Sequence, residues 1–259
     1  MNWDPDFTTR NAILGQLAGL VAFDEPDWPS LAGLNRRLAA GLPVRFVSEE
    51  HFTDLACYYE EAVAQGVVPT RSANWHDFFG AVIWHLFPRT KAWLNQRHMD
   101  DIRAHGARQR TPRRDRITHF DECGLVLAVP EGDDAEALAL LQAHDWHGLF
   151  LDRRARWGND WQPFIFGHAL YEQALAPFIG LTAKAVVLAL PAGFFTRPRH
   201  EQYPLLDRAL CARLQDQALF DRPRPLQPLP LLGIPGWWPA SEQPAFYDNT
   251  DYFRPRRQR

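Results

Sequence analysis

The sequence predicts an α+β fold: a single, mainly helical domain with a small mixed or antiparallel sheet and an extended C-terminal arm. Some segments repeat apolar residues at helical spacing, and others are short runs of β-branched and aliphatic residues typical of strands. Because the two kinds do not alternate regularly, a doubly wound parallel sheet is not expected. Residues 221–259 are rich in proline and show little periodicity. They are expected to form an arm held on the body by Trp237, Trp238, Phe246, Tyr247 and Phe253.

The N-terminal part, residues 1–70, is acidic, with ten aspartates and glutamates against four arginines. Segments 9–22 and 30–40 have helical spacing, and Ser30 is a suitable N-cap for the second of them. Residues 43–48 alternate like a short strand. A further helix is expected to begin at Ser48 and run to about Ala64, with an apolar stripe made of Phe52, Leu55, Ala56 and Tyr59.

The body, residues 71–220, is expected to contain both helices and strands. Its first helix, 74–87, has Asn74 as N-cap and ends at Pro88, which can itself begin a helix to about Ala104. The stretch RITHFDECGLVLAV (116–129) predicts two strands around a turn at Asp121–Gly124. The remaining pattern predicts helices at 133–144, 168–175 and 203–219 and strands at 163–167 and 183–190.

The bulk composition favours one cytoplasmic domain, residues 1–259. A hydrophobic content of 46% and a charged content of 23% are ordinary for a globular protein. The N-terminus lacks the pattern of a signal peptide, and the longest apolar run, 185–195, is too short to span a bilayer. The cysteines are odd in number and far apart, which favours reduced thiols over disulfides or a zinc site: Cys57, Cys123 and Cys211.

His76 is the most distinctive polar residue of the segment 74–87. It occupies the second helical position and has no capping duty, whereas Asn74 and Asp77 are explained as cap residues. A helix N-terminus disfavours an imidazolium ion, so a neutral His76 is suited to accept a proton or bind a metal. The alternative is a core histidine with satisfied hydrogen bonds. His85 lies about 180° around the helix, so one straight helix cannot offer both imidazoles to one metal ion.

Two further motifs supply a histidine and carboxylates. In FGHALYE, His168 and Glu172 are one helical turn apart, so the carboxylate can orient the imidazole, although ordinary surface pairs share this spacing. In FDECG, Asp121 or Glu122 offers a second carboxylate, although acids and glycine also simply favour turns. No nucleotide-binding glycine loop, HExxH, CxxC or GxSxG motif is present. The one cofactor these residues suggest is a divalent metal on His76 or His168.

His98, Asp101 and His105 share one helix face at spacings of three and four, which also permits metal binding. The helix that carries them is polar, however, so the same three residues are equally typical of its solvent-exposed side.

The basic residues are almost all arginine, with only two lysines, Lys91 and Lys184, among 28. Lys91 therefore stands out as a compact ammonium that the planar guanidinium of arginine does not imitate. Together with Arg89 and Asn74 it is expected to bind an anionic substrate. The alternative is that two lysines have merely survived a general bias towards arginine.

Arginines cluster at Arg108–Arg116, within RQRTPRRDR, and again at the end of the chain. Such clusters can bind phosphates or nucleic acid. They are also common in solvated loops, and no stacking aromatic residues are interleaved with them here.

Five blocks together resemble a bacterial family, domain of unknown function 3025: NWHDFFGAVIWHLFPRTKAWLN, FDECG, FGHALYE, PLLGIPGWWP and FYDNTDYFRP. They extend from about residue 72 to residue 255. The resemblance implies a single bacterial domain and a shared plan that includes Asn74, His76, Asp77, Arg89, Lys91, His168 and Glu172. The family has no activity to carry over.

We therefore expect a His/carboxylate enzyme, hydrolase-like, that uses a metal or general acid/base catalysis on a small or anionic substrate. His76 would act as base or metal ligand, Glu172 would orient His168, and Asp121 or Glu122 would supply a second carboxylate. The competing hypothesis is a non-catalytic binding or scaffolding module, with nucleic-acid or phosphate binding through Arg108–Arg116 as a further possibility.

Overall fold

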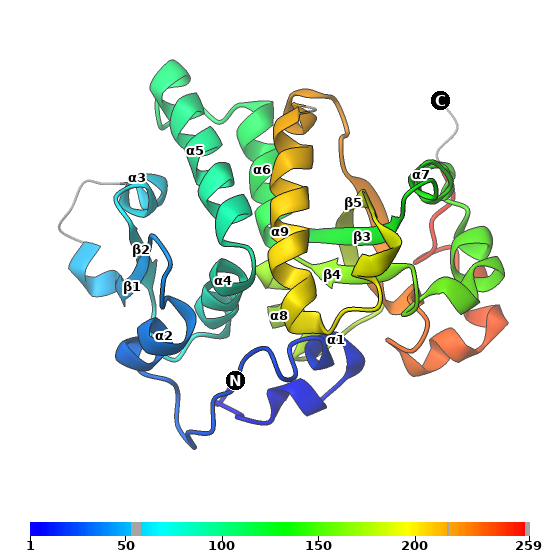
Figure 1. The fold of residues 1–259 in the computed structure, drawn as a ribbon, viewed down its shortest axis with the longest axis horizontal. Coiled ribbons are helices and arrows are strands. Elements are labelled where there is room, and N and C mark those ends of the chain that lie inside the picture. The colour runs from blue at the N-terminus through cyan, green and yellow to red at the C-terminus, as the bar shows by residue number, and fades with distance from the viewer. Residues whose placement is uncertain (53–57, 217, 257–259) are drawn as a thin grey trace.

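A four-stranded mixed sheet lies beside a group of long helices in the computed structural model, which describes residues 1–52, 58–216 and 218–256 (Figure 1). The sheet has the order β4–β3–β5–β6. Central strand β3 (Gly124–Pro130) pairs in parallel with β5 (Thr182–Leu190) and antiparallel with β4 (Gln162–Ile165). Six of the seven β3 residues are buried, as its uninterrupted apolar sequence requires. The α+β class with a small mixed sheet is confirmed.

The N-terminal part forms a separate two-stranded sheet, in which β1 (Arg45–Ser48) pairs in parallel with β2 (Val67–Thr70). Only β1 was predicted from the sequence. The helix predicted at 9–22 is reduced to the short α1 (Ala12–Gly15), capped by Asn11. In contrast, α2 (Leu31–Leu38) begins after its predicted cap, because the Ser30 hydroxyl accepts a hydrogen bond from the Gly33 amide.

The helix predicted from Ser48 to Ala64 is broken into a 3-10 turn at Glu49–Phe52 and α3 (Tyr59–Ala64). Leu55 and Ala56 of its predicted stripe, and Cys57, lie outside the described residues.

The two helices predicted around Pro88 are confirmed as α4 (Trp75–Leu86) and α5 (Pro88–His105). The Asn74 side chain accepts a hydrogen bond from the Asp77 amide at 3.1 Å and so caps α4. Most of α4 is buried, which its apolar composition on all sides predicts.

The prediction of two strands around a turn at 116–129 is wrong. Its first half belongs to α6 (Pro112–Cys123), and only the second half is strand β3. Thr111 caps this helix and Pro112 occupies its first turn, while Ile117 and Phe120 face the core. Tertiary burial of these two residues overrides the turn signal of DECG. Asp121 and Glu122 therefore lie in the last turn of a helix.

The rest of the body consists of α7 (Asp134–Ala143), α8 (His168–Ala174) and α9 (Arg199–Asp216), close to the predicted segments. Helix α9 runs alongside α5 and also contacts α4 and strand β5 of the sheet (Figure 1). No helix in the described ranges is long and apolar enough to cross a membrane. Cys123 and Cys211 are free thiols.

The C-terminal arm packs on the body and adds strand β6 (Gln227–Pro230) to the sheet. Tyr247 donates a hydrogen bond to the Gly233 carbonyl, and its ring stacks on Phe150. Tyr252 donates to the Leu181 carbonyl. The arm is therefore anchored by buried tyrosines as well as by apolar contact.

Candidate functional site

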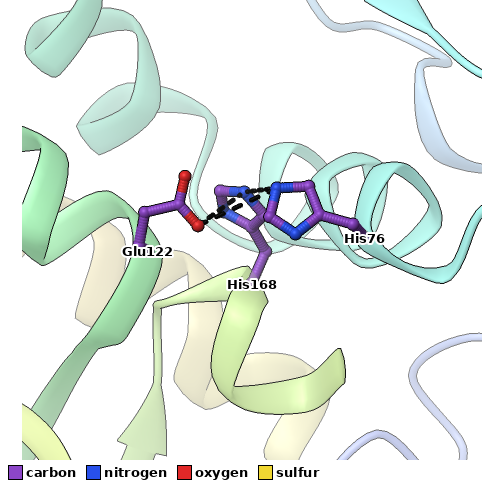
Figure 2. A group of neighbouring side chains, drawn as sticks. All are labelled: His76, Glu122 and His168. Carbon is purple, nitrogen blue, oxygen red and sulfur yellow. Dashed lines mark hydrogen bonds and ion pairs between the residues drawn. The ribbon is translucent and has the colours of Figure 1, made fainter. Parts of the chain in front are cut away.

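His76, Glu122 and His168 come together from three helices that are distant in sequence (Figure 2). His76 lies in the first turn of α4, Glu122 in the last turn of α6, and His168 at the start of α8. The Nε2 atoms of the two histidines are 3.0 Å apart. Glu122 Oε2 lies 3.4 Å from Nε2 of His168 and 3.8 Å from Nε2 of His76.

The outer nitrogen of each imidazole is held by a different acceptor. His168 donates from Nδ1 to the backbone carbonyl oxygen of Asp121 at 2.9 Å. Nδ1 of His76 lies 2.8 Å from Oε2 of Glu172. This differs from the expected pairing of Glu172 with His168. The His168 ring turns towards the end of α6, which leaves the carboxylate one turn along α8 to contact His76 on the neighbouring helix.

These outer bonds determine which ring nitrogens carry lone pairs. Carbonyl and carboxylate oxygens only accept, so Nδ1 of each ring carries a hydrogen, and the neutral form of either ring has its lone pair at Nε2. The two Nε2 lone pairs and the Glu122 carboxylate then face the same point. Three acceptors in this arrangement repel one another unless a cation or an added proton lies between them.

Close backbone packing places His168 beside Glu122. A Cβ atom on Gly167 would lie 2.3 Å from the Glu122 carbonyl oxygen and 2.5 Å from the Cys123 amide nitrogen. The Gly167 amide also donates to the Gly124 carbonyl at 2.8 Å. Only glycine allows the start of α8 to approach the end of α6 this closely.

Burial shifts the pKa values of two members of the cluster. His168 is 7% exposed, and its burial lowers its pKa to about 4, in favour of the neutral ring. Burial raises the pKa of Glu122 above its ordinary value. Both shifts favour the neutral form of the group when no counter-ion is near. A bound cation would instead favour the ionised form of Glu122 and lower its pKa.

Lys91 and Asp121 form a buried ion pair next to the cluster. Lys91 Nζ lies 2.6 and 2.8 Å from the two carboxylate oxygens of Asp121, and its side chain is 8% exposed. Burial acts to raise the pKa of Asp121, but the charge of Lys91 and its hydrogen bonds lower the pKa below the ordinary value. Asp121 thus stays ionised, while its carbonyl orients His168 and its side chain holds Lys91.

The other two residues predicted to bind substrate lie elsewhere. Asn74 caps α4. The Arg89 side chain is exposed, and its amide donates to Asp207 on α9. The structure therefore brings together His76, His168, Glu172, Glu122, Asp121 and Lys91, but neither Asn74 nor Arg89.

A small hollow of about 160 Å³ opens beside Glu122 and Asp121. It reaches Lys91, and His98 lines it with a buried Nδ1 that has no hydrogen-bond partner among the described residues. Burial lowers the pKa of His98, so its ring is neutral. The sequence pattern of His98, Asp101 and His105 permitted either a metal site or the solvated side of the helix. In the structure Asp101 bonds to Thr111, and His105 is exposed.

The arginines of the 108–116 stretch are mostly engaged within the protein. Arg110 pairs with Asp115 and Arg113 with Asp221, while Arg114 is buried against the Ala107 carbonyl and Glu60. Much of their charge is therefore neutralised locally.

The fold and the site define an α+β protein with a His/carboxylate cluster between three helices. The chain belongs to the family described as Protein of unknown function (DUF3025), whose model matches residues 44–257. No curated protein and no solved structure matches the chain. The family match covers the whole of the cluster and most of the arm.

Proposed function

We propose that the protein is a metal-assisted hydrolase in which His76, His168 and Glu122 bind one divalent transition-metal ion. The observation that carries this proposal is the convergence of two Nε2 lone pairs and a carboxylate on one point. A cation there removes the repulsion between the three acceptors and matches the usual preference of such metals for imidazole and carboxylate.

The surroundings of the histidines have the form found around metal ligands. Metal-binding histidines usually donate their second ring N–H to a carboxylate or a backbone carbonyl, which fixes the tautomer and raises the basicity of the ligand. Glu172 does this for His76, and the Asp121 carbonyl does it for His168. Two histidines that served only to fill the core would not need an acceptor at each Nδ1 atom. Those acceptors direct both Nε2 lone pairs towards the same point.

Two histidines and one carboxylate leave at least one metal position open, which is the pattern of catalytic rather than structural zinc. A metal ion in such a site supplies a Lewis acid and an activated water nucleophile. The hollow beside Glu122 offers space for a small polar substrate, and the neutral His98 and the Lys91 ammonium are among the hydrogen-bonding groups that line it. A bacterial origin and a cytoplasmic location are part of this proposal.

Metal analysis of the purified protein tests the proposal. Protein prepared without added metal or chelator is expected to contain close to one zinc or similar ion per chain by plasma mass spectrometry. His168→Gln is expected to lose it, whereas His105→Gln, which alters an exposed histidine outside the cluster, keeps it. Circular dichroism verifies that both variants fold. Equal metal content in the two variants, or none in the wild type after reconstitution, overturns the metal centre.

A further inference from the structure

Five basic side chains surround a large groove on another part of the molecule, formed by α6, β5, the chain before β6 and the end of the arm. The groove has a volume of about 1730 Å³, and its basic lining residues are Arg116, Lys184, Arg224, Arg254 and Arg256. His119 and His144 add two imidazoles, and no aspartate or glutamate is among the lining residues. The fold thus gathers basic residues that are scattered over 141 positions of the sequence.

The carboxylates that the structure describes do not neutralise these cations. Among the described residues, none of the five forms an ion pair with a carboxylate, although many other arginines of the chain do, such as Arg153, Arg154 and Arg156. Arg116 donates to the Phe220 carbonyl and Arg254 to the Asp251 carbonyl, which satisfies N–H groups but leaves the charge. Unpaired charges of one sign around a hollow reinforce each other's field.

The groove is built from anchored segments. Lys184 projects from the inner strand β5. The Arg254 carbonyl accepts hydrogen bonds from the Trp146 indole and His144 Nδ1, both at 3.0 Å, and the preceding Tyr252 and Phe253 are buried. Three prolines, at 223, 225 and 228, stiffen the wall that carries Arg224.

A second hollow of about 200 Å³ continues the groove past Arg224. It adds Arg213 and Arg222 and a single acid, Asp134. The basic surface is therefore extended in one direction rather than confined to one pocket.

The size and lining of the groove define its ligand. Its volume exceeds the roughly 300–1,000 Å³ of ordinary small-molecule sites. Guanidinium groups match phosphate oxygens in a two-pronged geometry. The lining contains no phenylalanine, tyrosine or tryptophan on which unpaired bases could stack. We propose that this groove binds the phosphate backbone of double-stranded nucleic acid without reading its sequence. The binding does not depend on the metal centre.

Fluorescence anisotropy with a labelled 20-base-pair duplex tests this surface. With five phosphate contacts, the logarithm of the association constant falls with the logarithm of salt concentration at a slope of about −4.5, which is about a 500-fold loss from 50 to 200 mM salt. The triple variant Lys184→Gln/Arg224→Gln/Arg256→Gln is expected to weaken binding at 50 mM salt and to reduce the slope by about 3.

The matched control removes three exposed arginines outside the groove, Arg36→Gln/Arg103→Gln/Arg108→Gln, and is expected to bind like the wild type. Weaker binding in this control than in the groove variant overturns the assignment to this surface. A labelled single strand and poly-glutamate are measured in parallel. Equal affinity for poly-glutamate shows an acidic protein partner, and preference for the single strand shows another mode of recognition; either result refutes duplex backbone binding.

Discussion

Nε2 of His76 faces Nε2 of His168 at 3.0 Å, although each ring already donates its other N–H to an oxygen acceptor. Two neutral imidazoles in these tautomers share no proton between them. Their apposition, with the Glu122 carboxylate 3.4 Å from His168, is the arrangement a metal ion stabilises.

Replacing Glu172 separates the roles of ligand and supporting residue. Glu172→Gln removes the negative charge beside Nδ1 of His76 but leaves all three proposed ligands in place. Metal affinity is expected to fall about 10- to 100-fold, since the loss of an outer-shell carboxylate weakens its histidine ligand. Competition with a chelator measures this. Glu131→Gln, which changes an exposed glutamate outside the cluster, is the control. Unchanged affinity in Glu172→Gln would show that the Glu172 carboxylate does not support a metal-bound His76.

Replacing Lys91 tests the buried pair. Lys91→Met leaves the ionised Asp121 without its partner and is expected to lower the free energy of unfolding by about 2–4 kcal/mol. The double variant Lys91→Met/Asp121→Asn removes the stranded charge and is expected to recover part of that loss. Urea denaturation measures these two variants and the single variant Asp121→Asn. A double variant as unstable as the sum of the single variants would mean that the two side chains do not interact.

Replacing Gly167 tests the close approach that positions His168. In Gly167→Ala the new methyl group would meet the backbone of Glu122 and Cys123, so α6 and α8 must separate. A loss of about 1–3 kcal/mol in stability is expected, together with weaker metal binding. Gly193→Ala, where no atom lies within 4 Å of the added Cβ, is the matched control for the loss of a glycine. Equal effects of the two changes would contradict the tight packing at Gly167.

Stability of the metal-free protein is expected to fall on acidification. His168 has a folded-state pKa of about 4, whereas an unfolded histidine titrates near 6.5, so the unfolded chain binds the proton first as the pH drops. The stability contributed by neutral His168 is present above about pH 6.5 and is lost progressively towards pH 4. Between pH 7 and pH 5 the loss from this group is about 2 kcal/mol.

Urea denaturation of the chelator-treated protein at the two pH values measures this loss, with His168→Gln as comparison. A smaller loss is expected in the variant. An identical pH dependence in both proteins would exclude His168 as its source.

Local signals identified most of the helices and their caps. Ser30 and Asn74 begin helices where predicted, because a capping side chain and the amide it accepts from are only three residues apart. The same local reasoning failed at FDECG. There the turn-forming composition gave way to burial of Ile117 and Phe120, which only the assembled core provides. Strand β2 was missed because its pairing with β1 is equally a tertiary contact.

The residue types of the candidate site were also visible in the sequence, but their partners were not. The i, i+4 spacing suggested that Glu172 serves His168, whereas the carboxylate contacts His76 across 96 positions of the chain. Neither the narrow gap at Gly167 nor the lining of the hollow by His98 has a local pattern, since each depends on how helices pack.

By itself, then, the sequence determined the α+β class, the capped helix that carries His76, the family blocks and the short set of histidines and carboxylates worth testing. Tertiary structure alone decided that His76 and His168 face each other, that Asp121 neutralises Lys91, and that scattered arginines line one groove. The physical reason is the distance along the chain over which each kind of interaction acts. Capping and periodicity act over a few residues, whereas the contacts that make a site form only when α4, α6 and α8 pack together.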